Sequence, residues 1–444
     1  MNKEVHNTMT VCIGIRRENK NEWERRVPLV PDDVRELREE HGVEVWLQPS
    51  PIRAFAAEDY ERAGATLQED LSHCPVVFAI KEVPEKLLEP DRTYVFFAHV
   101  IKGQEHNMPM LKRMLEQSCT LIDYEKVLDE RGRRVVFFGN YAGLAGMIDA
   151  LWALGRRLDW EGIANPFSTM RLAHDYATLE EAQAAVTALG ERIASEGLPD
   201  SLVPMVIGVA GYGNVGRGVQ EILALLPTQD VDPADLTSVT ANPDPARNLI
   251  YKVTFKEEHM VEPISPDHQF ELQDYYQHPA KYRGVFARYL PHLTVLMNAI
   301  YWDKQYPRLV TRSDLRALYA SPTLPRLRVI GDISCDIEGA IEATVRCTDP
   351  GNPVFVYDPT TGQDTDGWAG RGPVILAIDN LPGELPRESS TTFSRTLKPL
   401  VPAIARADYS VPFEELDLPP LIKNAVIAHQ GNLTPNYRYL EKYL

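Results

Sequence analysis

The sequence has few cysteines and no long apolar run. Its five cysteines are odd in number and lack the C-x-x-C spacing typical of zinc sites or redox pairs. This pattern predicts reduced thiols, a cytoplasmic protein and no bound metal. No stretch of about 18 consecutive apolar residues occurs, and the polar start MNKEVHNTMT lacks the apolar segment of an export signal. We therefore expect neither export nor membrane association.

Positive charge is also scarce. The 46 Lys and Arg residues are outnumbered by 63 Asp and Glu, which gives a formal net charge of -17 at pH 7. Such a balance argues against nucleic acid as a main partner, although it is compatible with a local basic site for an acidic substrate. The 444 residues, 44% hydrophobic and 25% charged, are typical of a globular enzyme of about two to three domains.

One strong nucleotide-binding pattern is present. An apolar run at 206–210 is followed by three glycines at G-x-G-x-x-G spacing and then by apolar residues at helical period through 226. The first glycine allows a tight turn, the second lets the backbone approach a pyrophosphate, and the third permits close helix packing. We predict a dinucleotide-binding β-turn-α unit with cofactor-binding residues Gly211, Gly213, Asn214, Val215 and Gly216.

Alternating strand and helix patterns predict an α/β protein with two lobes. Expected strands of the first lobe are 11–16, 43–47, 76–80, 94–98, 120–124 and 134–138, with helices at 31–40, 57–63 and 108–117. A helix over 141–158 has small residues early, which suits close packing and a connection between lobes. Expected later elements are a helix at 179–196 and strands at 206–210, 236–240, 294–299, 328–333 and 374–378. Residues 243–288 are weakly patterned, so we expect an inserted subdomain or flap there.

Three first-lobe strands end in residues suited to proton transfer. Lys81 and Glu82 follow one strand, His99 follows the next, and Glu125 follows a third. Charged residues commonly end strands because loops meet water. Together, however, a lysine and a histidine can form a general acid/base pair, and a nearby carboxylate can shift their pKa values. Arg26, in a highly charged segment, is either a surface charge or a clamp for a substrate carboxylate.

Seven blocks carry a resemblance to a known family: ERRVPLVP, AIKEVPE, FFAHVIKGQ, LIDYEKVLDERGRRVVFFGNYAGLAG, NAIYWDKQYPRLVT, DISCDIEGAIE and AIDNLPGELPRESS. They resemble the lysine–2-oxoglutarate reductase half of bifunctional aminoadipic semialdehyde synthases. They are also similar to lysine-forming saccharopine dehydrogenases, within the alanine dehydrogenase and transhydrogenase superfamily. The resemblance runs from about Val11 to the C-terminus.

The resemblance implies two Rossmann-like lobes flanking a cleft, the first of them discontinuous. Residues 1–140 plus 380–444 would form the substrate and catalytic lobe, and 141–379 the dinucleotide-binding lobe. The chain from about 380 to its end is expected to be helical. The 54 residues after Ser390 are too few for a second nucleotide-binding domain of roughly 100 residues, so a monofunctional reductase is expected.

The resemblance also implies residue roles. The acid/base pair falls on Lys81 and His99, supported by Glu82 and Glu125. Substrate-binding cations fall on Arg26, Lys102 and Lys20, although the ENKNEW segment is one residue longer than the saccharopine dehydrogenase pattern. Asp379 would lie near the nicotinamide and the substrate amine, and it also reads as a helix N-cap. Further residues implied on the nicotinamide side are Asn298, Ile300 and Tyr301.

The implied reaction joins the lysine ε-amine to 2-oxoglutarate and gives saccharopine, with hydride from NAD(P)H. Alternatives are a related amino-acid dehydrogenase that uses ornithine or ammonia, and a non-catalytic dinucleotide-binding regulator. The partners expected are these small molecules; a homo-oligomer is compatible with the sequence, which does not fix the oligomeric state. The strand expected at 236–240 ends without an acid that would bind the ribose 2′-hydroxyl, so NADP is expected, with NAD as the alternative.

Overall fold

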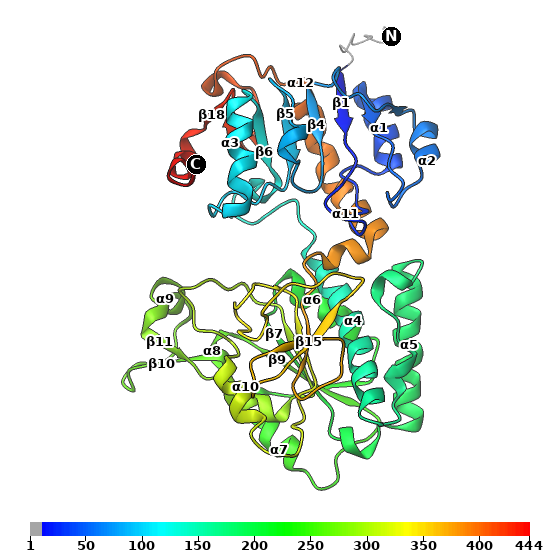
Figure 1. Ribbon diagram of the computed structural model, residues 1–444, viewed down its shortest axis with the longest axis vertical. Coiled ribbons are helices and arrows are strands. Elements are labelled where there is room, and N and C mark those ends of the chain that lie inside the picture. The colour runs from blue at the N-terminus through cyan, green and yellow to red at the C-terminus, as the bar shows by residue number, and fades with distance from the viewer. Residues whose placement is uncertain (1–10) are drawn as a thin grey trace, which may run out of the picture. The chain divides into compact units, whose positions relative to one another are not determined.

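The computed structural model describes residues 11–444, so the polar stretch 1–10 considered above lies outside the described residues. The chain divides into two compact units. Unit 1 comprises Met1–Phe138 and Pro386–Leu444, and unit 2 comprises Gly139–Leu385. Each is an α/β unit built on an eight-stranded, mostly parallel sheet, which confirms the predicted fold class (Figure 1).

The sheet of unit 1 has the strand order β18-β17-β6-β5-β4-β1-β2-β3. Strands β1 to β6 are parallel to their neighbours, and β17 joins β6 in antiparallel orientation. Its strands are β1 (Val11–Ile15), β2 (Val43–Leu47), β3 (Thr66–Leu67), β4 (Val76–Phe78), β5 (Thr93–Phe96), β6 (Thr120–Asp123), β17 (Val426–His429) and β18 (Asn432–Leu433). Its helices are α1 (Pro31–His41), α2 (Ala57–Arg62), α3 (Met108–Glu116), α11 (Pro386–Leu397), α12 (Val401–Arg406) and α13 (Pro420–Lys423).

The sheet of unit 2 has the order β15-β14-β16-β13-β12-β7-β9-β8. Its strands are β7 (Val206–Ala210), β8 (Thr228–Asp230), β9 (Ile250–Phe255), β12 (Val295–Asn298), β13 (Val329–Asp332), β14 (Val354–Tyr357), β15 (Asp364–Asp366) and β16 (Val374–Leu376). A separate antiparallel pair consists of β10 (Val261–Pro263) and β11 (Tyr282–Gly284). The helices are α4 (Gly139–Trp160), α5 (Leu179–Glu196), α6 (Asn214–Leu223), α7 (Leu236–Ala241), α8 (Glu257–Met260), α9 (Leu272–Gln277) and α10 (Arg312–Leu318).

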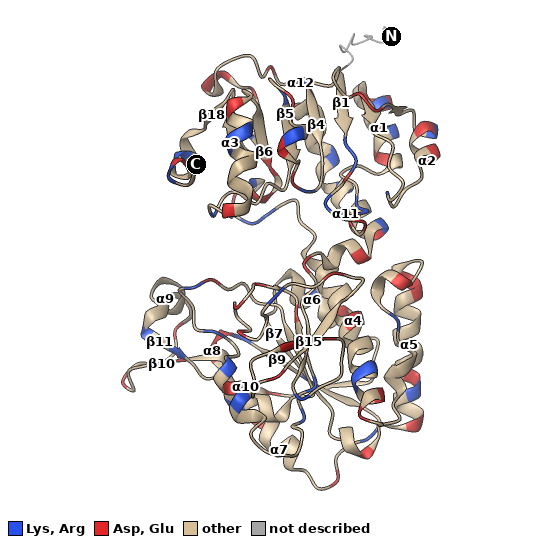
Figure 2. Ribbon diagram, viewed as in Figure 1, with Lys and Arg blue, Asp and Glu red and all other residues tan. Residues whose placement is uncertain are grey.

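Strand β7 shows why the sheet of unit 2 is buried on both faces. All five of its residues are buried; Ile207 and Val209 belong to one apolar cluster, whereas Val206 and Ala210 belong to another. This is the expected environment of a central parallel strand with helices on both sides. Figure 2 shows the same feature, since charged residues lie mainly on helices and loops and the central strands of both sheets carry few.

Small residues let helix α4 pack closely on α6. A Cβ atom on Gly143 would lie only 2.0 Å from the carbonyl oxygen of Val215, and one on Gly218 would lie 2.1 Å from that of Asn140. The small residues near the start of α4 therefore have a structural role, because the two helix backbones meet where larger side chains cannot fit.

Several predicted elements are wrong. Residues 236–240 form helix α7 instead of a strand, because only Leu236 is buried and the segment continues from a 3-10 turn capped by Asp232. Residues 134–138 make one isolated bridge, between Arg134 and Leu128, before α4 begins. The supposed insert at 243–288 contains β9, a full partner of β7.

The C-terminal segment also differs from the expected run of helices. Its buried residues 426–429 pair with β6 as β17, and the chain closes in a 3-10 helix over Pro435–Tyr443. A four-residue apolar run is too short to distinguish a strand from a helix turn by periodicity.

Candidate active site

Four adjacent strands of unit 1 present polar groups at one edge of its sheet. Strands β6, β5, β4 and β1 are parallel neighbours, so their carboxyl ends meet at the same edge. The chain continues from them to Glu125, His99, Lys81 and Glu18, respectively. Three of these residues were predicted from the sequence; Glu18 was not, because it lies in a charged loop whose folded path no local pattern reveals.

His99 and Glu82 form a close pair at this edge. Nδ1 of His99 lies 2.5 Å from Oε1 of Glu82, and Nζ of Lys20 lies 4.0 Å from the other carboxylate oxygen. Burial alone would raise the pKa of Glu82, but the hydrogen bond and electrostatic interaction with His99, followed by the charges of Lys20 and Lys81, lower it to about 2. Glu82 is thus an ionised partner that orients the imidazole ring of His99.

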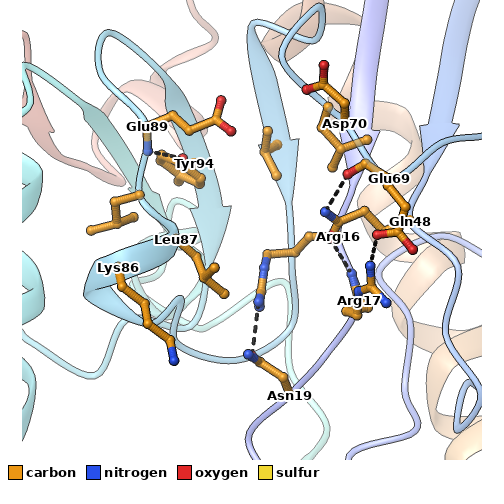
Figure 3. A pocket seen from close by; sticks show the side chains of 13 residues that line it. Arg16, Arg17, Asn19, Gln48, Glu69, Asp70, Lys86, Leu87, Glu89 and Tyr94 are labelled. Carbon is orange, nitrogen blue, oxygen red and sulfur yellow. Dashed lines mark hydrogen bonds and ion pairs between the residues drawn. The ribbon is translucent and has the colours of Figure 1, made fainter.

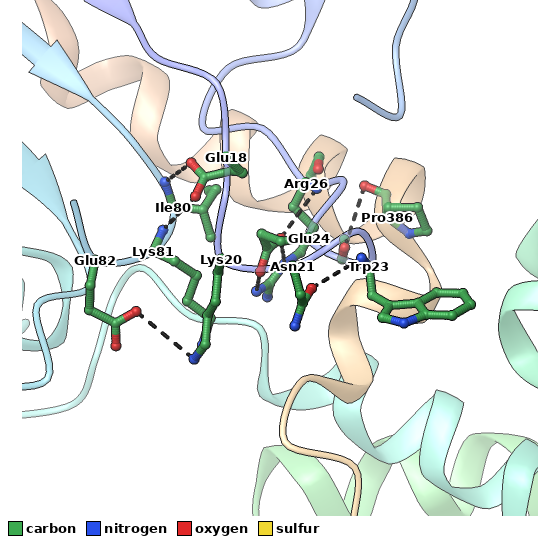
Figure 4. A network of polar contacts seen from close by, with 12 residues as sticks. Glu18, Lys20, Asn21, Trp23, Glu24, Arg26, Ile80, Lys81, Glu82 and Pro386 are labelled. Carbon is green, nitrogen blue, oxygen red and sulfur yellow. Dashed lines mark hydrogen bonds and ion pairs between the residues drawn. The ribbon is translucent and has the colours of Figure 1, made fainter. Parts of the chain in front are cut away.

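Lys81 directly precedes Glu82 in the chain (Figure 4), and it is buried. Its backbone N–H and that of Ile80 donate to the two carboxylate oxygens of Glu18, at 3.1 and 2.7 Å. Burial of the amine, followed by the charges of Arg26 and Lys20, lowers the pKa of Lys81. Burial and the charge of Glu24 raise the pKa of Glu18 to about 7. A buried lysine with a lowered pKa gives up its proton more readily than a lysine in water.

Arg26 is buried and already engaged by a carboxylate. Its Nε and Nη2 donate to the two oxygens of Glu24 at 2.8 and 2.6 Å, and its guanidinium lies 4.2 Å from the ring centroid of Phe138. Glu24 was not identified from the sequence, although it stands only two residues before Arg26. The other two expected substrate-binding cations, Lys20 and Lys102, are exposed.

Glu125 also has a partner that the sequence did not indicate. Nη2 of Arg134 donates to its Oε1 at 2.6 Å. The neighbouring Asp123 is fully buried and accepts from the backbone N–H of Glu125 at 2.9 Å. Burial and the charge of Glu125 raise the pKa of Asp123 to about 7.

A separate pocket of about 330 Å³ opens in unit 1 (Figure 3). Three basic and three acidic side chains line it: Arg16, Arg17, Lys86, Glu69, Asp70 and Glu89. Arg16 donates to Asn19 at 3.0 Å. These charges balance, and none of the expected site residues lines the pocket, so we do not assign it to the substrate.

The glycine turn in unit 2 has the geometry of a phosphate-binding loop. Gly211 has φ of +102°, and a Cβ there would lie 2.7 Å from the carbonyl oxygen of Ala299. A Cβ on Gly216 would lie 2.5 Å from the carbonyl oxygen of Gly211, whereas one on Gly213 would meet nothing within 4 Å. The first and third glycines are therefore required by the protein's own packing. The second borders open space where a phosphate can approach.

This turn borders a pocket of about 400 Å³ that is rich in tyrosine. Strand β9 is followed by Lys256 and then by Glu257, which lines the pocket. Glu257 accepts hydrogen bonds from the hydroxyls of Tyr212 at 3.1 Å and Tyr276 at 2.7 Å. The pocket also includes Ile300 and Tyr301, two residues expected on the cofactor side. The sequence does not indicate Glu257, because β9 lies in the weakly patterned region 243–288.

Asn298, in contrast, is a fully buried part of an internal network. Its amide donates to Asp332 at 2.8 Å and to Ser334 at 2.9 Å, and Thr344 donates to the other oxygen of Asp332 at 2.6 Å. Asp379 is exposed beyond the end of β16. Asn380, not Asp379, occupies the N-cap of the following 3-10 helix at Leu381–Glu384, so the capping interpretation of Asp379 is wrong.

Two domain descriptions match the chain, and both are of the same protein family. Residues 14–145 match "Alanine dehydrogenase/PNT, N-terminal domain", and residues 280–436 match "Alanine dehydrogenase/PNT, C-terminal domain". The fold is similar to that of an L-alanine dehydrogenase, with a TM-score of 0.60 at 17% identity over 97% of this chain and 99% of that one. A transhydrogenase from Sinorhizobium meliloti gives a TM-score of 0.56 at 15% identity, and the match covers 95% of this chain and 100% of the transhydrogenase chain.

Curated relatives are more similar in sequence. The chain is 38% identical to alpha-aminoadipic semialdehyde synthase, mitochondrial, from Bos taurus over 97% of its own length and 47% of the relative's. It is 36% identical to the synthase of Arabidopsis thaliana over 97% of its own length and 41% of the relative's. It is 28% identical to the saccharopine dehydrogenase [NAD(+), L-lysine-forming] of Neurospora crassa over 87% of its own length and 89% of the relative's. The chain thus spans about half the length of the synthases. Across residues 11–444, none of the helices has the length and apolar character needed to span a membrane.

Proposed function

The chain belongs to the alanine dehydrogenase/PNT family, and from that premise we propose that it is a lysine–2-oxoglutarate reductase that forms saccharopine. The observation that carries the proposal is the cluster at the sheet edge of unit 1. There a buried lysine with a lowered pKa, Lys81, directly precedes Glu82, the carboxylate that holds His99. The names of the curated relatives support the choice of lysine and saccharopine.

The reaction needs two proton-transfer groups. A neutral amine must attack the keto carbon, water must leave the resulting carbinolamine, and the iminium must be reduced. Lys81 would protonate the keto oxygen, because its lowered pKa favours release of its proton, and after taking up a proton from solvent it would protonate the departing hydroxyl. His99, oriented by Glu82, would take the proton from the amine. When bound, a reduced nicotinamide supplies the hydride for the final reduction.

Basic side chains of unit 1 would bind the substrate carboxylates. Lys20 and Lys102 are exposed and carry charges that suit the two carboxylates of 2-oxoglutarate and the α-carboxylate of lysine. Arg26 is buried against Glu24, so a substrate carboxylate at Arg26 must compete with that ion pair. We therefore assign first contact with substrate to the two lysines and place Arg26 deeper in the site.

We propose NAD rather than NADP as the cofactor. Residues 236–240, expected as the strand that ends without an acid and so favours NADP, belong to helix α7. The strand next to β7 is β9, and the acid after it is Glu257. A carboxylate at this position accepts hydrogen bonds from the ribose 2′-hydroxyl of NAD and repels the 2′-phosphate of NADP. The hydroxyls of Tyr212 and Tyr276 donate to Glu257 and hold its side chain in place.

The proposal is tested by following nicotinamide oxidation with 2-oxoglutarate and one of three amines: lysine, ornithine or ammonia. We expect turnover with lysine and little with ammonia. Activity with ammonia alone would contradict the reductase and favour an alanine dehydrogenase type of reaction. Preference for ornithine would change the substrate and leave the reaction class intact. Nucleotide binding without turnover on any amine would favour a non-catalytic regulator.

A further inference from the structure

Folding brings together two cysteines and an aspartate that lie far apart in the sequence of unit 2. Cys335 follows β13, Cys347 precedes β14, and Asp379 follows β16. Their two sulfur atoms and one carboxylate oxygen all lie within 4.8 Å of one another. Within residues 11–444, this is the one group of three or more His, Cys, Asp or Glu side chains with that spacing.

The backbone holds these three residues in place. The N–H of Asp379 donates to the carbonyl oxygen of Thr348 at 3.2 Å, which fixes it beside the residue after Cys347. The N–H of Cys335 donates to the carbonyl oxygen of Asp332 at 3.2 Å, and the side chain of Asp332 is locked in the buried network with Asn298. The thiol of Cys347 donates to the carbonyl oxygen of Cys335 at 3.2 Å. The segments that carry the three side chains are thus joined to each other or to the sheet.

The donor set suits a thiophilic divalent cation. Zinc binds two thiolates and a carboxylate at about 2.0–2.3 Å, whereas calcium and magnesium prefer oxygen ligands only. Ligand atoms around a tetrahedral zinc ion lie about 4 Å apart or less, so closing the cluster needs shifts of only about 1 Å. The two cysteines are half-buried and Asp379 is exposed, which leaves a path for an ion from solvent.

We propose that Cys335, Cys347 and Asp379 form a zinc-binding site with an open fourth coordination position. The two thiols lose their protons to solvent on binding, and no oxidation or reduction takes place. The proposal has a functional consequence that rests on the proposed reductase activity. Because Asp379 is expected near the nicotinamide and the substrate amine, a bound zinc ion would engage this carboxylate and inhibit turnover.

Binding is measured first, without nucleotide or substrate. The metal-free chain, kept reduced with a phosphine, is titrated with Zn²⁺ by calorimetry and with Cd²⁺ by thiolate-to-metal charge-transfer absorption in the ultraviolet. We expect one equivalent per chain. Cys335→Ser and Cys347→Ser, made separately, should each weaken binding at least about tenfold, the lower end of what loss of a group near the metal costs. Asp379→Asn should weaken binding without abolishing the cadmium–thiolate absorption.

A matched control lies in unit 1, where the sulfur atoms of Cys12 and Cys74 are 2.8 Å apart. Cys12→Ser removes one thiol from that pair and should leave the stoichiometry and affinity of the zinc site unchanged. Melting curves of each variant verify that it is folded. No zinc uptake by the folded wild type would overturn the proposal, as would binding lost in Cys12→Ser or kept in the Cys335→Ser/Cys347→Ser double variant.

Inhibition is measured second and separates this site from the reductase assignment. Zinc should inhibit the wild type, whereas Cys335→Ser should keep its activity and lose its sensitivity. Zinc binding by a chain without reductase activity would refute only the proposed function. An active chain that neither binds nor responds to zinc would refute only the metal site.

Discussion

Nδ1 of His99 lies 2.5 Å from Oε1 of Glu82, and this pair links two adjacent strands of unit 1 at the edge that carries Lys81. His99 has a φ of +48°, an uncommon backbone conformation for a residue other than glycine. The carboxylate and this backbone conformation together fix the direction of the ring. The account of catalysis depends on that fixed direction.

Glu82→Gln should remove a stabilising charge interaction that depends on pH. The pKa of Glu82 is about 2 in the folded chain and about 4.5 when unperturbed. Its contribution is therefore fully present above pH 4.5 and is lost as the pH falls from 4.5 to 2. We expect the variant to be less stable than wild type at pH 7, by at most about 3 kcal/mol, and equally stable near pH 2. Denaturant unfolding across this range measures the difference; a gap that is constant with pH would contradict the assigned pKa.

Lys81→Met should lower kcat by ~10²–10⁴-fold, because it removes the general acid. Nucleotide affinity should not change, since Lys81 lies in unit 1 and the glycine turn lies in unit 2. Steady-state kinetics and nucleotide titration measure the two effects. Lys86→Met, which changes an exposed lysine of the same unit, is the matched control. Its kcat and nucleotide affinity should be close to those of the wild type. Near-native turnover in Lys81→Met would show that another group donates the proton.

Gly213→Val should abolish dinucleotide binding and leave the fold intact. A Cβ at Gly213 meets no atom of the protein within 4 Å, so the added side chain occupies only the space that a phosphate needs. Gly216→Ala is the contrasting variant. Its Cβ would lie 2.5 Å from the carbonyl oxygen of Gly211, so it should lower the melting temperature as well. Retained nucleotide affinity in Gly213→Val would exclude this turn as the pyrophosphate site.

Glu257→Gln should reduce the preference for NADH over NADPH. The 2′-phosphate of NADPH would face the carboxylate of Glu257, and a contact between like charges costs several kcal/mol, so we expect a wild-type preference for NADH of about 100-fold or more. Asp230→Asn is the control, because Asp230 ends the neighbouring strand β8 and pairs with Lys252 at 3.1 Å. The preference is measured as the ratio of kcat/KM with NADH to kcat/KM with NADPH, in the wild type and in each variant. A wild type that prefers NADPH would contradict the role given to Glu257.

The sequence predicted those features that a local pattern determines. The β7-turn-α6 unit has its strand, three glycines and helix within 20 consecutive residues, and Lys81, His99 and Glu125 each follow a recognisable apolar strand. Partners brought in by folding were missed. Glu18 reaches the backbone of Lys81 across 63 residues, and Cys335 meets Asp379 only because β13 and β16 are neighbours. Strand β9 was missed because its apolar residues alternate with Lys252 and Thr254 inside a charged region.

The most direct test of the central claim is the identity of the product formed by this chain alone. Lysine, 2-oxoglutarate and NADH are incubated with the purified protein, and the mixture is analysed by mass spectrometry while nicotinamide oxidation is recorded. The account predicts that saccharopine accumulates, with one nicotinamide oxidised for each molecule formed. No condensation product from lysine, together with glutamate formed from 2-oxoglutarate when ammonia replaces lysine in the mixture, would contradict it.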